Sequence, residues 1–334
     1  MGPAEMPDPA LPKDKILAFG DLVAQLRPTQ WVKNVVVFAG PAAGMRLFSL
    51  EPLLAATTTF VAFCLAASAT YIINDIVDRE ADASHPTKRF RPIARGAIGP
   101  APALVVSGVL LLISGSLTIA VLPPGVTVVL ACYFLLTLAY SLTLKRRMIL
   151  DVIAIATGFV LRAWAGSLAV GVATSEWLVA CMFTLCLFLG FGKRRCEIAM
   201  IGNAENAGQH RRTLDRYSPQ LLTHLITVCA GIAVMTFLIY TMDRTGSSVP
   251  FHKEQLFYTL PLVVYGVFRY AMLTELGVYS GPTDIVLKDR ALLATVLSWA
   301  AAALLIVYQE PLLGPAGLAG LLPGDANVPH AGCR

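Results

Sequence analysis

Residues 53–82, LLAATTTFVAFCLAASATYIINDIVDREAD, run from a long apolar stretch into a row of acidic side chains. Asp75, Asp78 and Asp82 are spaced by three and four residues, so on one helix they would share a face with Asn74 and Tyr71. Carboxylates at the mouth of a membrane helix are unfavourable unless a cation neutralises them. Mg²⁺ does so when it binds one or two carboxylates together with phosphate oxygens. The stretch therefore predicts a membrane enzyme that handles a diphosphate.

The composition of the whole chain predicts a polytopic membrane protein. Of its 334 residues, 56% are hydrophobic and 14% are charged, whereas soluble domains carry about 25% charged residues. Because a membrane span needs about 20 apolar residues, we expect an all-α bundle of about nine transmembrane helices. The first expected span is short and contains Pro41. The nine spans lie near residues 32–47, 51–75, 101–121, 125–144, 149–171, 175–193, 218–241, 256–278 and 290–309.

Three parts of the chain differ in character. Residues 1–30 are expected to form a cytoplasmic segment with an interfacial helix over residues 14–27, where apolar side chains fall on one stripe. Residues 31–310 would form the transmembrane catalytic domain, and residues 311–334, rich in Gly and Pro, an irregular extracytoplasmic tail. Lys and Arg are concentrated in alternate connecting segments. The positive-inside rule then predicts a plasma-membrane protein with a cytoplasmic N-terminus, acid row and active site, and an extracytoplasmic C-terminus.

Basic side chains gather in the segments on the same side as the acid row. Residues 26–34, LRPTQWVKN, bring Arg27, Lys33 and Asn34 to that face. In residues 193–197, KRRCE, Lys193 can pair with Glu197, while Lys193 and Arg194 could bind phosphate or snorkel to the interface. Residues 85–96, HPTKRFRPIARG, could bind phosphate oxygens, although a positive-inside loop would look the same. The basic residues there are Lys88, Arg89, Arg91 and Arg95.

The fourth and fifth expected spans add four polar residues. In residues 140–152, YSLTLKRRMILDV, Tyr140 and Lys145 lie at the same membrane depth as Asp151. Arg162 follows three helical turns later on the face of Asp151, roughly 16 Å along the axis. An Arg at that depth normally faces a cavity and has a partner. Contact with a lipid phosphate and a structural ion pair with another span are both open.

The motifs together resemble the UbiA superfamily of intramembrane prenyltransferases. NDIVDREAD, the nine expected spans and the polar cytoplasmic loops carry the broad resemblance. LRPTQWVKN, HPTKRFRPI, YSLTLKRRMILDV and GKRRCE extend it over residues 26 to about 300. These four are similar to the branch that acts on decaprenyl phosphate in actinobacterial cell-wall synthesis. That branch moves 5-phosphoribosyl from phosphoribosyl pyrophosphate to the lipid phosphate and releases pyrophosphate, an early step towards the lipid-linked arabinose donor of cell-wall arabinan.

The resemblance implies roles for individual residues. Mg²⁺, the expected cofactor, would be held by Asp75 and Asp78 with Asn74 and Asp82, and Lys145 and Asp151 would join the two metal-binding aspartates in catalysis. The donor and the polyprenyl phosphate would be bound by Lys33, Asn34, Tyr71, Asn74, Lys88, Arg91, Tyr140, Arg162, Lys193, Arg194 and Glu197. The expected partners are these two substrates and the membrane, without nucleic acid. A homo-oligomer, namely a trimer, is a further expectation.

Two other functions remain open at the level of sequence. An aromatic prenyltransferase of the quinone or haem type would carry a second acidic row after the sixth span. Here that region reads KRRCEIAMIGN, with Glu197 as its single acid, which favours a small and densely charged donor. A transporter or channel would show internal repeats with helix breaks near the bilayer midplane. The clustering of polar residues at one membrane face favours an enzyme instead.

Overall fold

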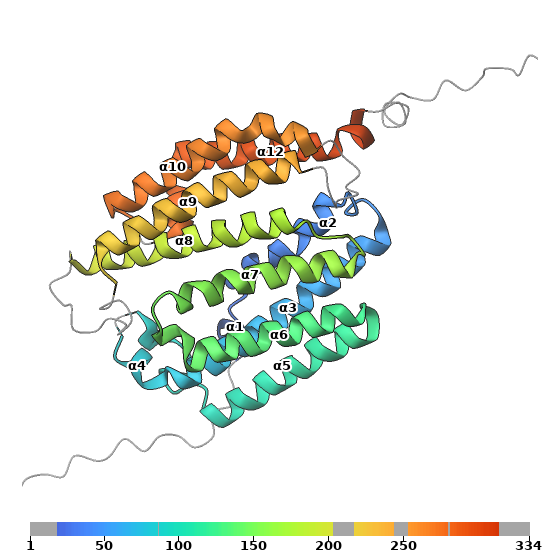
Figure 1. Cartoon of the computed structure of the whole chain (residues 1–334). Helices are drawn as coiled ribbons and strands as arrows, with labels where there is room; N and C mark the ends of the chain where they lie inside the picture. Colours follow the sequence, from blue (N-terminus) through green and yellow to red (C-terminus); the bar gives the residue numbers. More distant parts are fainter. Residues whose placement is uncertain (1–18, 86, 203–216, 244–252, 280, 314–334) are drawn as a thin grey trace, which may run out of the picture.

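The chain folds into a bundle of helices that lie side by side along a common direction (Figure 1). The structure, a computed structural model, describes residues 19–85, 87–202, 217–243, 253–279 and 281–313. Within these ranges every regular element is a helix, which confirms the all-α prediction. In a bilayer a helix satisfies its own backbone hydrogen bonds, so a chain of this composition can cross it many times.

Among the described residues, eight helices are long and apolar enough to cross a membrane, and they match eight of the nine expected spans. The η6 turn, Lys253–Thr259, leads into the seventh of them. Their bounds are α3 Leu50–Val77, α5 Pro100–Val121, α6 Pro124–Leu142, α7 Leu150–Ala169, α8 Glu176–Gly202, α9 Pro219–Met242, α10 Leu260–Leu276 and α12 Arg290–Leu313. The remaining short elements are α1 Phe19–Leu26, η1 Pro28–Phe38, α2 Ala39–Ala43, α4 Arg79–Ala83, η2 Lys88–Phe90, η3 Leu144–Arg146 and α11 Pro282–Lys288.

The expected first span, residues 32–47, takes a different form from the other eight. It is a 3₁₀ helix, η1, of 11 residues followed by the 5-residue helix α2. Both pack against α7, where a Cβ on Gly166 would lie 1.8 Å from the carbonyl oxygen of Val37. At the rises of 3₁₀ and α helices the two would extend roughly 30 Å, close to the thickness of the hydrocarbon core. About nine crossings therefore remain consistent with the bundle.

Local sequence signals explain where the helices begin better than where they end. Pro100, Pro124 and Pro219 each occupy the first helical turn, where the missing N–H costs nothing. Ser218 caps α9 by accepting a hydrogen bond from the amide of Leu221. At the other end of its span, α8 continues to Gly202, well beyond the expected limit at residue 193. An apolar window does not detect a helix that continues as a polar extension.

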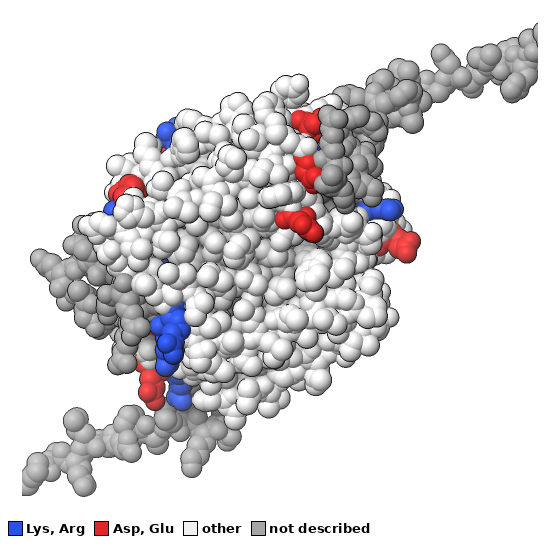
Figure 2. Space-filling model, viewed as in Figure 1, with Lys and Arg blue, Asp and Glu red and all other residues white. Residues whose placement is uncertain are grey.

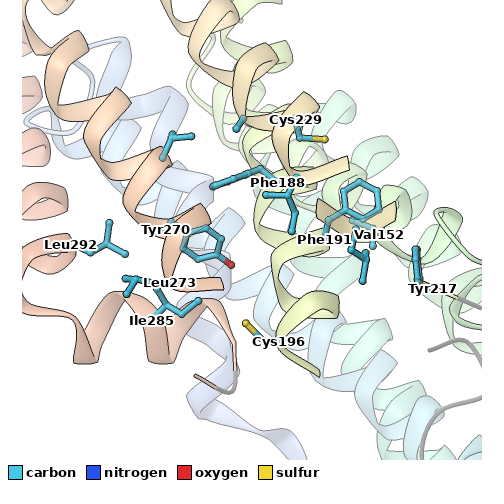
Figure 3. Close-up of a cluster of buried hydrophobic side chains, with 14 residues drawn as sticks. Val152, Phe188, Phe191, Cys196, Tyr217, Cys229, Tyr270, Leu273, Ile285 and Leu292 are labelled. Atoms are coloured by element: carbon cyan, nitrogen blue, oxygen red, sulfur yellow. The ribbon is translucent and has the colours of Figure 1, made fainter. Parts of the chain in front are cut away.

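The central helices of the bundle are α3 and α7. In their most apolar windows 56% of the residues are buried, compared with 17% in α5, α8 and α12. A second packed region joins α8 to α12, with Phe188, Tyr270 and Leu292 in its core (Figure 3). The middle of the face in Figure 2 is almost free of charge, and charged side chains gather towards the two ends of the helices. The polar residues of α3 and α7 thus lie on the two most enclosed helices.

The two terminal parts are described only in part. Of the expected interfacial helix over residues 14–27, α1 covers Phe19–Leu26 and packs against α3. Its Gln25 side chain is buried. Most of the tail expected at residues 311–334 lies outside the described residues, apart from the last turn of α12. The division into three parts stays a prediction.

Candidate functional site

The acid row lies where α3 ends, at the end of the bundle that also holds α4, η3 and the start of α7 (Figure 1). One continuous helix was expected there, and that prediction is wrong in one respect. The helix is interrupted at Asp78, which has φ −93° and ψ 6°, and α4 resumes at Arg79. The amides of Asp78 and Asp82 still donate to the carbonyls of Asn74 and Asp78. The row therefore passes from α3 to α4 with only a local break.

Asp75 is the most heavily bonded carboxylate of the row and is 2% exposed. Nη2 of Arg27 lies 2.7 Å from both of its oxygens. Nη1 of Arg91 donates to Oδ1 over 3.1 Å, and Nε2 of Gln25 donates to Oδ2 over 2.8 Å. The guanidinium of Arg27 also lies 5.2 Å from the ring centre of Tyr71, one turn earlier on α3. Three segments distant in sequence thus meet at Asp75.

The other two aspartates have their own cations. Nη1 of Arg91 donates to Asp82 as well as to Asp75, and Nζ of Lys88 is 4.0 Å from Asp82. Lys145 is the buried residue of the η3 turn, and its Nζ donates to Asp78 over 2.6 Å and to Asn74 over 3.1 Å. The acid row therefore gathers cations from residues 26–34, 85–96 and 140–152, whereas Lys193 and Arg194 pair elsewhere, with Glu197. In this state the gathered cations neutralise the carboxylates of the row.

Arg162 forms a second polar centre inside the bundle and is 6% exposed. Its Nε donates to Oδ1 of Asn34 over 2.6 Å, Nη2 to the Tyr133 hydroxyl over 2.7 Å and Nη1 to the Gly158 carbonyl over 2.9 Å. Within the described residues all of these partners are uncharged, and no carboxylate pairs with the guanidinium. Within the part of the chain that the structure describes, Arg162 therefore forms no ion pair with another span. A buried cation without a counter-ion is a candidate site for an anionic ligand.

Asp151 belongs to a third, closed network. It is 1% exposed, and it accepts from Nε of Arg194 over 2.8 Å and from the Tyr217 hydroxyl over 2.9 Å. Burial raises the pKa of the Tyr217 phenol above its usual range, so the hydroxyl stays protonated and donates. Arg194 also pairs with Glu197, whose other oxygen is 3.9 Å from Nζ of Lys193. Asp151 therefore orients an arginine.

Lys33 and Tyr140 interact electrostatically with side chains of all three centres. The charges of Lys193, Arg162 and Arg27 all act on Lys33, whose side chain is exposed. Tyr140 interacts electrostatically with both Tyr71 and Arg194. These interactions indicate that the predicted site residues of η1, α3, α6, α7 and α8 lie in one region.

Three residues of this region were not predicted from the sequence. Tyr133 and Tyr217 sit in apolar surroundings and carry no motif, and Gln25 lies in a helix read as interfacial. Arg27 was predicted to lie on the same side as the acid row. Its contact with Asp75, 48 residues away in the sequence, could be seen only in the tertiary structure. A polar residue on the buried side of a short amphipathic helix is the one signal that could have indicated Gln25.

The oxygens of the acid row are chemically suited to Mg²⁺, which prefers hard oxygen ligands. Among the described residues no three acidic, His or Cys side chains are close enough to enclose a metal ion. Mg²⁺ usually needs only one or two carboxylates when phosphate oxygens supply the remaining positions. Asp75 and Asp78 with Asn74 and Asp82 fit that mode, provided that the paired cations give way.

Known proteins resemble the chain both in sequence and in fold. Residues 35–276 match the UbiA prenyltransferase family. The decaprenyl-phosphate phosphoribosyltransferase of Corynebacterium glutamicum is 33% identical over 301 residues, which cover 89% of this chain and 90% of that protein. The enzyme of the same name from Mycobacterium tuberculosis is 35% identical over 288 residues, covering 84% and 92%.

A solved structure has the same arrangement of helices at low sequence identity. The UbiA homolog from Archaeoglobus fulgidus bound to GPP and Mg²⁺ superimposes with a TM-score of 0.63 at 16% identity, covering 86% of this chain and 98% of that one. The resemblance to the superfamily, and to its decaprenyl-phosphate branch, is thereby confirmed. With eight apolar helices of spanning length and a family match over most of its length, the chain is a multi-pass membrane protein that belongs to the UbiA prenyltransferase family.

Proposed function

We propose that the chain transfers 5-phosphoribosyl from phosphoribosyl pyrophosphate to a polyprenyl phosphate such as decaprenyl phosphate, with release of pyrophosphate. The observation that carries this proposal is the pairing of two anion-binding centres at different depths. One is the cation-rich acid row where α3 ends, and the other is the buried Arg162 without a carboxylate partner in the described part of the chain. The names of the two bacterial relatives support the same reaction.

The acid row would receive the pyrophosphate end of the donor. Asp75 and Asp78, with Asn74 and Asp82, would hold Mg²⁺, which neutralises charge on the leaving group. Arg27, Arg91, Lys88 and Lys145 already lie within contact of these carboxylates. Once displaced from them, they can bind phosphate oxygens, Arg in bidentate fashion.

The deeper centre would receive the lipid phosphate. Arg162 lies inside the bundle, and the exposed Lys33 stands near it on η1. Departure of pyrophosphate leaves positive charge at C1 of the ribose, as in glycoside chemistry, and a phosphate oxygen of the lipid attacks that carbon. The lipid phosphate is ionised at neutral pH, so no general base is needed. The side chains then act by positioning and by electrostatic preorganisation.

The network around Asp151 would shape the site from the side of α8. Asp151 and Tyr217 fix Arg194, and Arg194 in turn holds Glu197 next to Lys193. The charge of Lys193 acts on Lys33. Tyr140 interacts electrostatically with Tyr71 and with Arg194. In this proposal Lys193 and Tyr140 contact substrate, while Asp151 and Arg194 position them.

In the cell the reaction would be an early step towards a lipid-linked arabinose donor for cell-wall arabinan. The donor is soluble, so the acid row would lie on the cytoplasmic side of the plasma membrane, as the distribution of Lys and Arg predicts. A trimer stays a prediction from sequence.

The test is an assay of purified protein with labelled phosphoribosyl pyrophosphate, decaprenyl phosphate and Mg²⁺. We expect a labelled lipid and free pyrophosphate, and loss of both when a chelator is added. The alternative, an aromatic prenyltransferase, predicts that no label enters the lipid. It also predicts that a prenyl diphosphate and an aromatic acceptor react instead. That result would refute the proposal.

A further inference from the structure

Helix α1 and the residue that follows it contribute one side chain each, Gln25 and Arg27, to the first carboxylate of the acid row. Arg27 follows α1 directly and has φ 53° and ψ 58°, in the left-handed region that non-glycine residues rarely adopt. Such a backbone persists only where surrounding contacts enforce it, and strained residues of this kind gather at functional sites. The side chain of Arg27 makes two bonds from Nη2 to Asp75.

Asp75 has no vacant acceptor position while Arg27 is paired with it. A carboxylate accepts about four hydrogen bonds. Asp75 receives two from Arg27, one from Arg91 and one from Gln25. A metal ion can therefore bind Asp75 only if at least one of these donors leaves, and Arg27 occupies both oxygens.

The second observation is an acceptor without a donor beside the same carboxylate. Gln25 is 2% exposed, and within the described residues its Oε1 has no hydrogen-bond partner. The orientation of the amide is fixed, because Nε2 donates to Asp75 and a carboxylate cannot donate in return. A buried carbonyl oxygen left unpaired is unfavourable, and a carbonyl oxygen is a good ligand for Mg²⁺. The surroundings of Asp75 are therefore complete only when a further group binds there.

The balance of charge points the same way. The three carboxylates of the row form direct ion pairs with four cationic side chains, so positive charge is in excess. A divalent cation alone is repelled by such a cluster. A cation that arrives with a pyrophosphate carries negative charge in total and is attracted. Metal and pyrophosphate should thus bind together.

We infer that Arg27 is a substrate-binding residue that competes with the metal ion for Asp75 and turns to the pyrophosphate of the donor when the metal takes its place. Tyr71 keeps the guanidinium in the site during this exchange, because the ring beneath it remains in contact after Asp75 is lost. The exchange makes binding of free metal weak and binding of the metal–pyrophosphate pair strong. The identity of the donor rests on the proposed function, but the competition for Asp75 does not.

The experiment measures the binding of Mn²⁺, as a probe for Mg²⁺, by electron paramagnetic resonance on detergent-solubilised protein without donor. We expect Arg27→Gln to bind Mn²⁺ on the order of tenfold more tightly than the unsubstituted chain, because a competing charge has been removed. Arg27→Lys, which keeps the charge but not the two-oxygen contact, should lie between them. With Mg²⁺ in excess, Arg27→Gln should bind phosphoribosyl pyrophosphate on the order of tenfold more weakly.

Arg95→Gln is the matched control. Arg95 lies on the same loop as Arg91 and pairs with Asp21 of α1, so the substitution also removes a positive charge and a contact to α1. It does not touch Asp75, and its affinity for Mn²⁺ should be unchanged. An equal increase in affinity with Arg95→Gln would attribute the effect to charge in general and overturn the inference.

An unchanged or weaker affinity for Mn²⁺ in Arg27→Gln would also overturn it. If that variant does not fold, Arg27→Lys still decides the question, since it must bind Mn²⁺ more tightly than the unsubstituted chain. Because the Mn²⁺ measurement needs neither donor nor lipid, it stands apart from the transfer assay. Tighter binding together with no labelled lipid would count against the proposed function alone.

Discussion

Two ionic networks at the same end of the bundle use the same residue types but are built from different parts of the chain. Around the acid row, the cations come from connecting segments: Arg27 follows α1, Arg91 lies in the loop after α4, and Lys145 lies on η3. Around Asp151, the partner Arg194 lies within a long helix and is 3% exposed. The first network can exchange its cations by moving loops, whereas the second cannot change without moving α7 against α8.

The two networks differ in whether their carboxylates can exchange partners and bind a metal ion or substrate. The side chain of Asp78 is a quarter exposed and pairs with Lys145. Asp151 is enclosed, with Arg194 and Tyr217 on its two oxygens. Buried ion pairs of this kind mainly fix geometry, and breaking one leaves a buried charge unpaired. We therefore expect substitutions in the first network to reduce turnover and substitutions in the second to reduce stability.

The largest effect is expected at the acid row. Asp75→Asn and Asp78→Asn should each lower the rate of lipid labelling on the order of a thousandfold, because a neutral amide cannot neutralise charge on the bound metal. The apparent Tm of Asp75→Asn in detergent should change little, since the two cations that it releases, Arg27 and Arg91, are partly exposed. Near-normal turnover in either variant would contradict the metal assignment.

The second effect should appear in stability. Asp151→Asn leaves the Arg194 guanidinium buried with Glu197 as its remaining partner and should destabilise the protein by about 3 kcal/mol. The measurement is thermal unfolding, with the double variant Asp151→Leu/Arg194→Met as control. That variant removes both charges and should unfold at a higher temperature than Asp151→Asn. A loss of turnover in Asp151→Asn without loss of stability would contradict the expectation that the second network acts on stability and the first on turnover.

A third prediction concerns the uncompensated cation. Arg162→Met should raise the KM for decaprenyl phosphate on the order of tenfold or more and leave the KM for the donor nearly unchanged. Arg269 offers the matched control, because it also lies in a spanning helix but has a bidentate partner, Asp289. Arg269→Met should not affect the KM for the lipid. Equal effects of both substitutions would exclude a specific phosphate contact at Arg162.

The smallest effect is expected at Tyr217. Tyr217→Phe removes the hydroxyl that donates to Asp151 and should destabilise the protein by about 1 kcal/mol. Because burial raises the pKa of the phenol, its contribution is fully present below the usual tyrosine pKa of about 10 and is lost only as the pH rises further. Thermal unfolding between about pH 6 and 9 should show a constant difference between Tyr217→Phe and the unsubstituted chain. A difference that changes in this range would contradict the assigned protonation state.

The sequence by itself determined the class of fold and the location of the acid row. Apolar runs of spanning length have one stable form in a bilayer, so eight helices could be located within the described residues, seven of them to within a few residues at both ends. The polar end of α8 and the 3₁₀ form of η1 were missed, because hydropathy does not register a polar extension or a tighter winding. The candidate site residues could be named, since each stands out against an apolar background.

Only the tertiary structure decided which of those residues meet. Lys145 reaches Asp78 across 67 positions and Arg162 reaches Asn34 across 128, and no spacing rule contains such distances. The same holds for Gln25 and Tyr217, ordinary residues in sequence that became partners of Asp75 and Asp151 through packing. Hydropathy is a property of consecutive residues, so it determines where the helices lie along the chain. Electrostatic pairing acts through space, so it appears only after the helices have been packed.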